Sequence, residues 1–174
     1  MIMPPRLRKL ALTVHVICSV GWFGAVAGFL VLAVAGLAGQ NPQTVPGAYL
    51  GMSLITSFVI IPLAFGSLLT GIVSSVGTGW GLFRYYWVVA KLLISVLATI
   101  VLLVHMRPID QLAAASSVSS FTADEHDVQT LMVIASGAAL VALIVLTALS
   151  VYKPRGVTSF AARSQDDQYE QRQA

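Results

Sequence analysis

Long apolar stretches, interrupted by short polar segments, run through most of the chain. Residues 10–83 contain no Asp, Glu, Lys or Arg, and residues 128–152 form a second charge-free stretch. A continuous apolar run longer than about 18 residues is typical of a helix that spans a lipid bilayer. The pattern predicts an all-α fold, a bundle of four transmembrane helices at about residues 10–37, 49–76, 86–106 and 128–152.

Turn-forming and polar residues mark the connections between these helices. Residues 39–46 and the Gly- and aromatic-rich residues 77–86 predict short loops, and residues 107–127 predict the longest one. Pro62 lies near the middle of the second span, where a proline usually kinks a helix. Residues 1–152 therefore form one predicted transmembrane domain. Residues 153–174 form a polar tail with too few apolar residues to fold alone, so we expect it to be disordered.

The composition narrows the class of protein. Of the 174 residues, 57% are hydrophobic and 10% are charged, whereas a soluble domain carries about 25% charged residues. This apolar surface exceeds what one small core can bury, so lipid must cover the excess. The net charge is +3, but the basic residues cluster at the predicted membrane boundaries. They indicate topology signals and contacts with anionic lipid rather than a nucleic-acid surface.

The distribution of basic residues also predicts the orientation. With the N-terminus inside, the outer loops contain only Arg107, and Lys91 lies within a span. Short cytoplasmic segments are enriched in Lys and Arg, which favours this orientation. The sequence thus predicts a multi-pass protein of the cell (plasma) membrane with both termini in the cytoplasm. The inner segments hold the remaining eight basic residues, Arg6, Arg8, Lys9, Arg84, Lys153, Arg155, Arg163 and Arg172.

Three ionisable residues lie inside the predicted spans, where such groups are costly and are therefore functional candidates: His15, Lys91 and His105. At 1.5 Å per residue, His15 and Lys91 both lie about 7 Å from the inner boundary, and His105 lies about 28 Å along the third helix. We therefore expect His15 and Lys91 to share a pocket. His15 and His105 are too far apart in depth to bind one metal ion.

The helical phase places aromatic residues beside these groups. His15 and Trp22 are seven residues apart and share one stripe, and Trp87 and Lys91 share a face. A neutral imidazole among aromatic and small residues suits a haem ligand. Arg84, together with Arg8 and Lys9 at the inner boundary, could bind the haem propionates.

Structural roles compete with these functional ones. An intramembrane histidine such as His15 can instead hydrogen-bond to a neighbouring helix, and Lys91 can extend to the inner lipid headgroups. His105, which lies near the outer surface beside Arg107, is most simply an interfacial residue. Cys18 is the single cysteine, so an intrachain disulfide is excluded.

Two short motifs resemble those of known membrane proteins. The first helix carries a His-x6-Trp-x-Gly pattern from His15 through Trp22 to Gly24, and the third reads Trp87-Val-Val-Ala-Lys91. Together they resemble the HemJ-type protoporphyrinogen oxidases, the CopD-like membrane proteins and a related group of uncharacterised bacterial four-helix membrane proteins. The resemblance implies His15 as an axial ligand of haem b, hence a metal ligand, and Lys91 as a catalytic partner near the tetrapyrrole.

Two functions follow as hypotheses. The first is binding of a b-type haem or porphyrin near the cytoplasmic leaflet, for electron transfer or porphyrin redox chemistry, with His15, Trp22 and Arg84 holding the cofactor. The second is a non-enzymatic membrane component: a small transporter, a copper-related permease or a subunit of a complex with a partner protein or a second copy. Whether the protein is an enzyme stays open.

Overall fold

The computed structural model describes residues 3–39, 41, 44–77, 85–115 and 123–152. The elements are α1 (Pro5–Ala38), α2 (Thr44–Ile55), a π-helical turn η1 (Thr56–Ile60), α3 (Ile61–Val76), α4 (Tyr86–Ala115) and α5 (Ala123–Tyr152). Because α2, η1 and α3 follow one another without a break, they form a single long helix, Thr44–Val76. The fold is therefore all-α, with four long helices, as the hydropathy pattern predicts.

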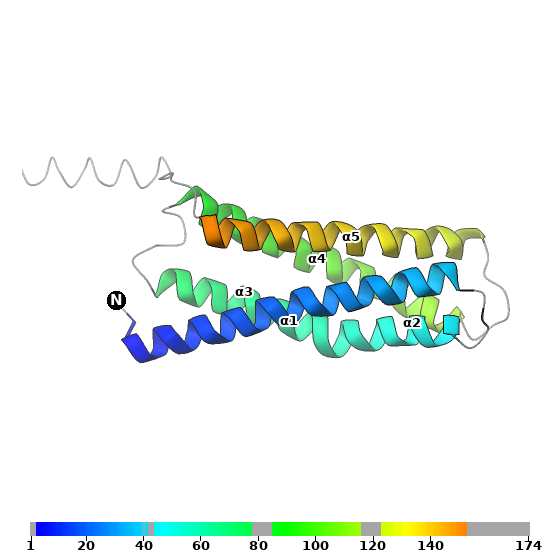
Figure 1. The fold of residues 1–174 in the computed structure, drawn as a ribbon, viewed down its shortest axis with the longest axis horizontal. Helices are drawn as coiled ribbons and strands as arrows, with labels where there is room; N and C mark the ends of the chain where they lie inside the picture. Colours follow the sequence, from blue (N-terminus) through cyan, green and yellow to red (C-terminus); the bar gives the residue numbers. More distant parts are fainter. Residues whose placement is uncertain (1–2, 40, 42–43, 78–84, 116–122, 153–174) are drawn as a thin grey trace, which may run out of the picture.

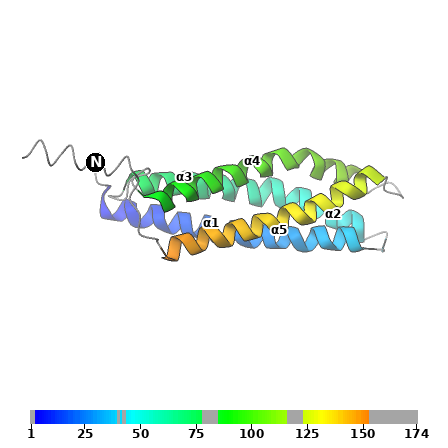
Figure 2. The same ribbon diagram turned by 90° about the horizontal axis from the view of Figure 1, so that it is seen from above.

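The four helices pack side by side and alternate in direction (Figures 1 and 2). Helix α1 packs against α2, α3 and α5, while α4 packs against α2, α3 and α5 from the other side. We call the end that holds the start of α1 and the end of α5 the terminal end, and the opposite one the loop end. The described parts of the chain thus begin and end on the same side of the bundle.

The outer surface of the bundle carries many large hydrophobic side chains. Large hydrophobic side chains such as Phe58, Leu93 and Val104 are exposed on the outside. Each of the four helices is long and apolar enough to cross a membrane, since about 20 residues span a hydrocarbon core of about 30 Å. Lipid is the solvent that accommodates such a surface, and by this criterion the chain is a multi-pass membrane protein with four spans.

The second long helix is irregular at the position where Pro62 predicts a kink. The backbone N–H of Ile61 donates to the carbonyl of Thr56, five residues earlier, which defines a π-helical turn. Pro62 itself has no N–H to donate. The wide turn places Thr56 and Ile60 in the interior, where both are almost completely buried.

Helix α4 extends further than the hydropathy pattern indicates. It ends at Ala115 instead of near Met106, with Pro108 inside it, so the long predicted loop starts later. The polar residues of this extension are typical of a loop, but the segment also has an apolar face, on which Ile109 and Leu112 are each only 2% exposed. Burial of these two side chains stabilises the helix past its proline. The start of α5 at Ala123 also precedes the predicted start near Val128.

Candidate functional site

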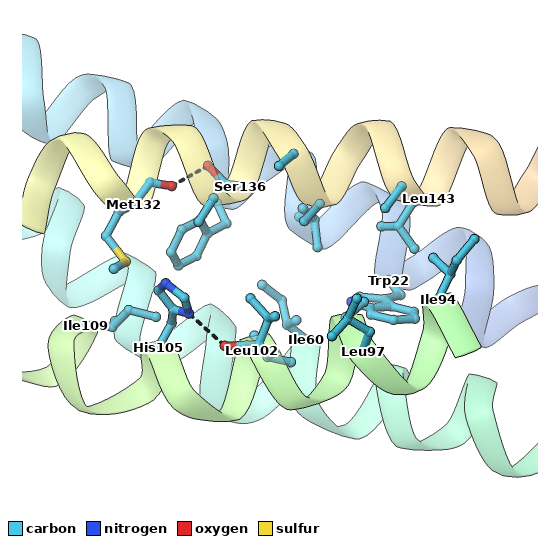
Figure 3. A pocket seen from close by; sticks show the side chains of 18 residues that line it. Trp22, Ile60, Ile94, Leu97, Leu102, His105, Ile109, Met132, Ser136 and Leu143 are labelled. Atoms are coloured by element: carbon cyan, nitrogen blue, oxygen red, sulfur yellow. Dashed lines mark hydrogen bonds between the residues drawn. The ribbon is translucent and has the colours of Figure 1, made fainter. Parts of the chain in front are cut away.

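An elongated cavity of about 300 Å³ lies between α4 and α5 (Figure 3). Helix α1 and the π-helical turn close it from behind with Trp22, Val26, Phe29 and Ile60. Along α4 its lining extends from Ile94 to Ile109, and along α5 from Met132 to Leu143. The cavity therefore occupies the middle of the bundle. Its volume is at the lower limit of small-molecule binding sites.

Small side chains on α5 create this space. The face of α5 toward the cavity carries Ser136 and four alanines, Ala135, Ala138, Ala139 and Ala142. Opposite them, α4 contributes bulkier residues such as Ile94, Leu97 and Leu102. Interiors usually pack without voids larger than a water molecule. Here the alanines are too short to fill the distance between the two helices, and the gap stays open.

The cavity reaches the outer surface of the bundle between α4 and α5. Leu97 is 62% exposed and Val101 is 41% exposed, yet both also line the cavity. Ala138 is exposed on the facing edge of α5. These residues form a rim that faces the hydrocarbon of the bilayer rather than water. A molecule dissolved in the membrane can therefore reach the cavity sideways.

His105 is the ionisable side chain among the described residues that line the cavity. The ring is half-buried, and Figure 3 shows it lying in the space between α4 and α5. Its Nδ1 lies 2.7 Å from the carbonyl oxygen of Val101, one turn earlier in α4. Because a carbonyl only accepts, Nδ1 must carry the proton in this contact. In the neutral imidazole, Nε2 is then an acceptor.

The interfacial role predicted for His105 is thus incomplete, because the residue also lines a cavity in the bundle. Helical phase gives the reason: Ile94, Ala98, Val101 and His105 follow one another at intervals of three or four residues and lie on one face of α4. All four line the cavity. This spacing is the signal in the sequence that could have placed His105 inside.

His15 lies in a different place, the interface between α1 and α3 at the terminal end. Its Nδ1 is 3.0 Å from the carbonyl oxygen of Ser67 and 3.2 Å from the hydroxyl of Thr70. Next to it, the hydroxyls of Ser19 and Ser67 are 2.8 Å apart. Gly71 makes room for the imidazole, since a Cβ added there would lie 3.1 Å from Cε1 of His15. The histidine therefore joins two helices, one of the roles that the sequence allowed.

Lys91 joins α4 to the neighbouring helix α5. Its ammonium donates to the hydroxyl of Ser150 over 2.6 Å, and Ser150 donates in turn to the carbonyl of Leu146. The Nζ atom also lies 5.9 Å from the centre of the Trp87 ring, so the two residues share a face as predicted. His15 and Lys91 both lie at the terminal end, but neither lines the α4–α5 cavity.

The remaining predicted site residues are separated. Trp22 is only 4% exposed and lines the cavity, two turns away from His15 along α1. Arg84 lies outside the described residues. Within the described parts of the chain, no group of three or more His, Cys, Asp or Glu side chains could hold a metal ion. The structure thus brings His15 and Lys91 to one end of the bundle, while Trp22 and His105 line the same cavity from its opposite ends.

Comparisons with known proteins identify no relative: no family model, curated protein or solved structure matches the chain. The class of protein is therefore shown by the fold alone, a membrane protein with four spans. The likeness to HemJ-type and CopD-like proteins stays a prediction from two motifs.

Proposed function

We propose that this protein binds an apolar molecule from the lipid phase in the cavity between α4 and α5. The observation that carries the proposal is the cavity itself, about 300 Å³ of space with almost wholly apolar lining residues and a rim exposed on the membrane-facing surface. Ligand sites are typically concave and apolar, with few polar groups that fix the orientation of the ligand. His105 is such a group here.

The test uses Trp22 as a reporter, because its buried indole lines the cavity. Trp80 and Trp87 are replaced by Phe, and the protein is reconstituted in bilayers of lipid with brominated acyl chains. Bromine atoms quench tryptophan fluorescence on close contact. A chain that enters between α4 and α5 reaches Trp22, so we expect strong quenching.

Ala139→Phe fills the cavity and should reduce this quenching at least severalfold. The matched control is Val141→Phe, which adds a similar bulk to an exposed position of α5 outside the cavity lining and should leave the quenching unchanged. Ala139→Leu, a smaller change, serves if the Phe variant does not fold. Equal quenching in all the variants would contradict the proposal, because bromine would then reach Trp22 by another route.

Tetrapyrrole binding at His15 is a second candidate. It is supported by the hydrogen bond between Nδ1 of His15 and the carbonyl of Ser67, because ligating histidines usually donate their other ring N–H to such an acceptor. Nε2 of His15 would be the iron ligand, and Lys91 would be the nearby cation that contacts a propionate or substrate. The bound haem would supply redox chemistry. This candidate ranks second because the α4–α5 cavity does not include His15.

A reduced-minus-oxidised absorbance spectrum tests the second candidate. The wild-type protein, purified in detergent after expression with adequate haem, is compared with His15→Ala. Bands of a b-type haem that disappear in the variant would support an axial ligand at His15. His105→Ala is the control, since it changes a histidine on another helix and should leave the bands intact. A featureless wild-type spectrum would rule the candidate out and leave the first proposal untouched.

A further inference from the structure

The chemistry of the cavity is asymmetric along its length. His105 lies in the half toward the loop end, while the lining at the other end consists of Trp22, Ile94 and Leu143 (Figure 3). His105 follows Ile94 by eleven positions in α4, which corresponds to a rise of about 16 Å. A ligand that fills this space therefore has an elongated apolar body and one end beside an imidazole.

The hydrogen bonds determine what that imidazole offers. Nδ1 of His105 is occupied by the carbonyl of Val101, and Figure 3 shows the other ring nitrogen turned toward α5. This second nitrogen, Nε2, is an acceptor in the neutral ring. Ser136 does not satisfy it, because the Ser136 hydroxyl is bonded within α5 to the carbonyls of Met132 and Val133.

We infer that the ligand is an elongated apolar molecule with a hydrogen-bond-donating hydroxyl at one end, which it donates to Nε2 of His105. The inference rests on the proposed function and specifies the chemical class of the ligand. An acceptor in a cavity with almost wholly apolar lining residues favours ligands with a donor over ligands without one, because an unpaired polar group among apolar neighbours is costly. Lipid-phase molecules with this chemistry are phenols, such as reduced quinones, and long-chain aliphatic alcohols.

The experiment compares pairs of molecules that differ only in the donor. Oleyl alcohol is paired with oleyl methyl ether, and 4-dodecylphenol with 4-dodecylanisole. Each is titrated in brominated lipid against the variant that retains Trp22 as its single tryptophan, and the concentration that halves the quenching is measured. One hydrogen bond is worth about tenfold in affinity, so we expect the hydroxyl compound of at least one pair to compete about tenfold better.

The pair with the larger ratio between the two half-quenching concentrations shows whether the ligand is an aliphatic alcohol or a phenol. Equal competition within both pairs would overturn the inference, even though the proposed function would survive, because the cavity would still bind apolar chains. If no compound relieves the quenching, both the inference and the proposed function are wrong.

His105→Phe provides the second readout. It keeps an aromatic ring in the cavity but removes the acceptor, so the tenfold preference should disappear while the ethers compete as they do in the wild type. Retention of the preference in this variant would also overturn the inference. If His105→Phe does not fold, the ligand pairs with wild-type His105 decide the question on their own.

Discussion

The two intramembrane histidines make the same kind of hydrogen bond but with different consequences. In both, Nδ1 contacts a backbone carbonyl, that of Ser67 for His15 and that of Val101 for His105. Ser67 belongs to α3, so the bond of His15 joins two helices. Val101 belongs to α4 itself, so the bond of His105 contributes nothing to helix association. The position of the acceptor therefore separates a structural histidine from one that is available to a ligand.

This difference predicts unequal effects of the same substitution. His15→Leu should lower the free energy of unfolding by about 1 kcal/mol, because it removes an interhelical hydrogen bond. His105→Leu should be neutral or stabilising, because it places an apolar side chain among apolar neighbours. Unfolding in mixed SDS micelles, followed by circular dichroism, measures both. An equal loss in the two variants would contradict the assignment of roles.

The contact between Lys91 and Ser150 allows a similar comparison. Ser150→Ala removes the hydroxyl that accepts from Lys91 across 2.6 Å and should cost about 1 kcal/mol in unfolding free energy. Thr147→Ala is the matched control, because among the described residues the Thr147 hydroxyl bonds to the carbonyl of Leu143 in its own helix. The same micelle titration measures both variants. If Ser150→Ala proved as mild as Thr147→Ala, the Lys91 contact would not stabilise the bundle.

At the level of helices, α1 and α2 approach each other closely at Gly36. A Cβ added at Gly36 would lie 2.6 Å from Cζ of the Tyr49 ring, and Tyr49 is almost completely buried. Gly24, in the same helix, has open space around it. A rigid ring in a packed interface has little room to move. The glycine at position 36 is therefore required by packing, while the one at position 24 is not.

Alanine substitutions at these two glycines should separate the effects of packing from those of helix propensity. Gly36→Ala should lower the unfolding free energy by about 1–3 kcal/mol through overpacking. Gly24→Ala should be neutral or stabilising by up to about 1 kcal/mol, since alanine is the better helix former. Thermal unfolding in detergent measures both. A Gly36→Ala variant as stable as Gly24→Ala would show that Tyr49 moves aside freely.

The sequence predicts the number and approximate limits of the helices because apolar length is a local property. The end of α4 is not predicted, because it depends on contacts between segments that are distant in the sequence. Arg107, Pro108 and Asp110 are typical of a loop, and only the burial of Ile109 and Leu112 in the folded bundle shows that this segment is helical. Spans that are apolar all round also carry little information about which face meets which neighbour. The cavity was therefore not predictable, since it depends on the alanine face of α5 meeting α4. The shared face of Trp87 and Lys91 was predictable, because it follows from the spacing of the two residues along one helix.

For the molecule as a whole, the arrangement of the helices places the two described ends on one side of the membrane but does not show which side is the cytoplasm. The start of α1 and the end of α5 lie at the same end of the bundle, so the two described ends face the same side of the membrane. The distribution of Lys and Arg predicts that this side is the cytoplasm, with eight basic residues there and only Arg107 toward the opposite side. The rim of the cavity belongs to neither side, because it faces lipid.

Cysteine labelling determines which end of the bundle faces the cytoplasm. Cys18 is the single native cysteine, so Cys18→Ala gives a background into which Asn41→Cys, at the loop end, and Ser164→Cys, in the tail, are introduced separately. A membrane-impermeant maleimide added to intact right-side-out vesicles should label Asn41→Cys and leave Ser164→Cys unlabelled until the vesicles are opened. The reverse pattern would place the loop end in the cytoplasm. His105, and with it the hydroxyl of the ligand, would then lie toward the inner leaflet.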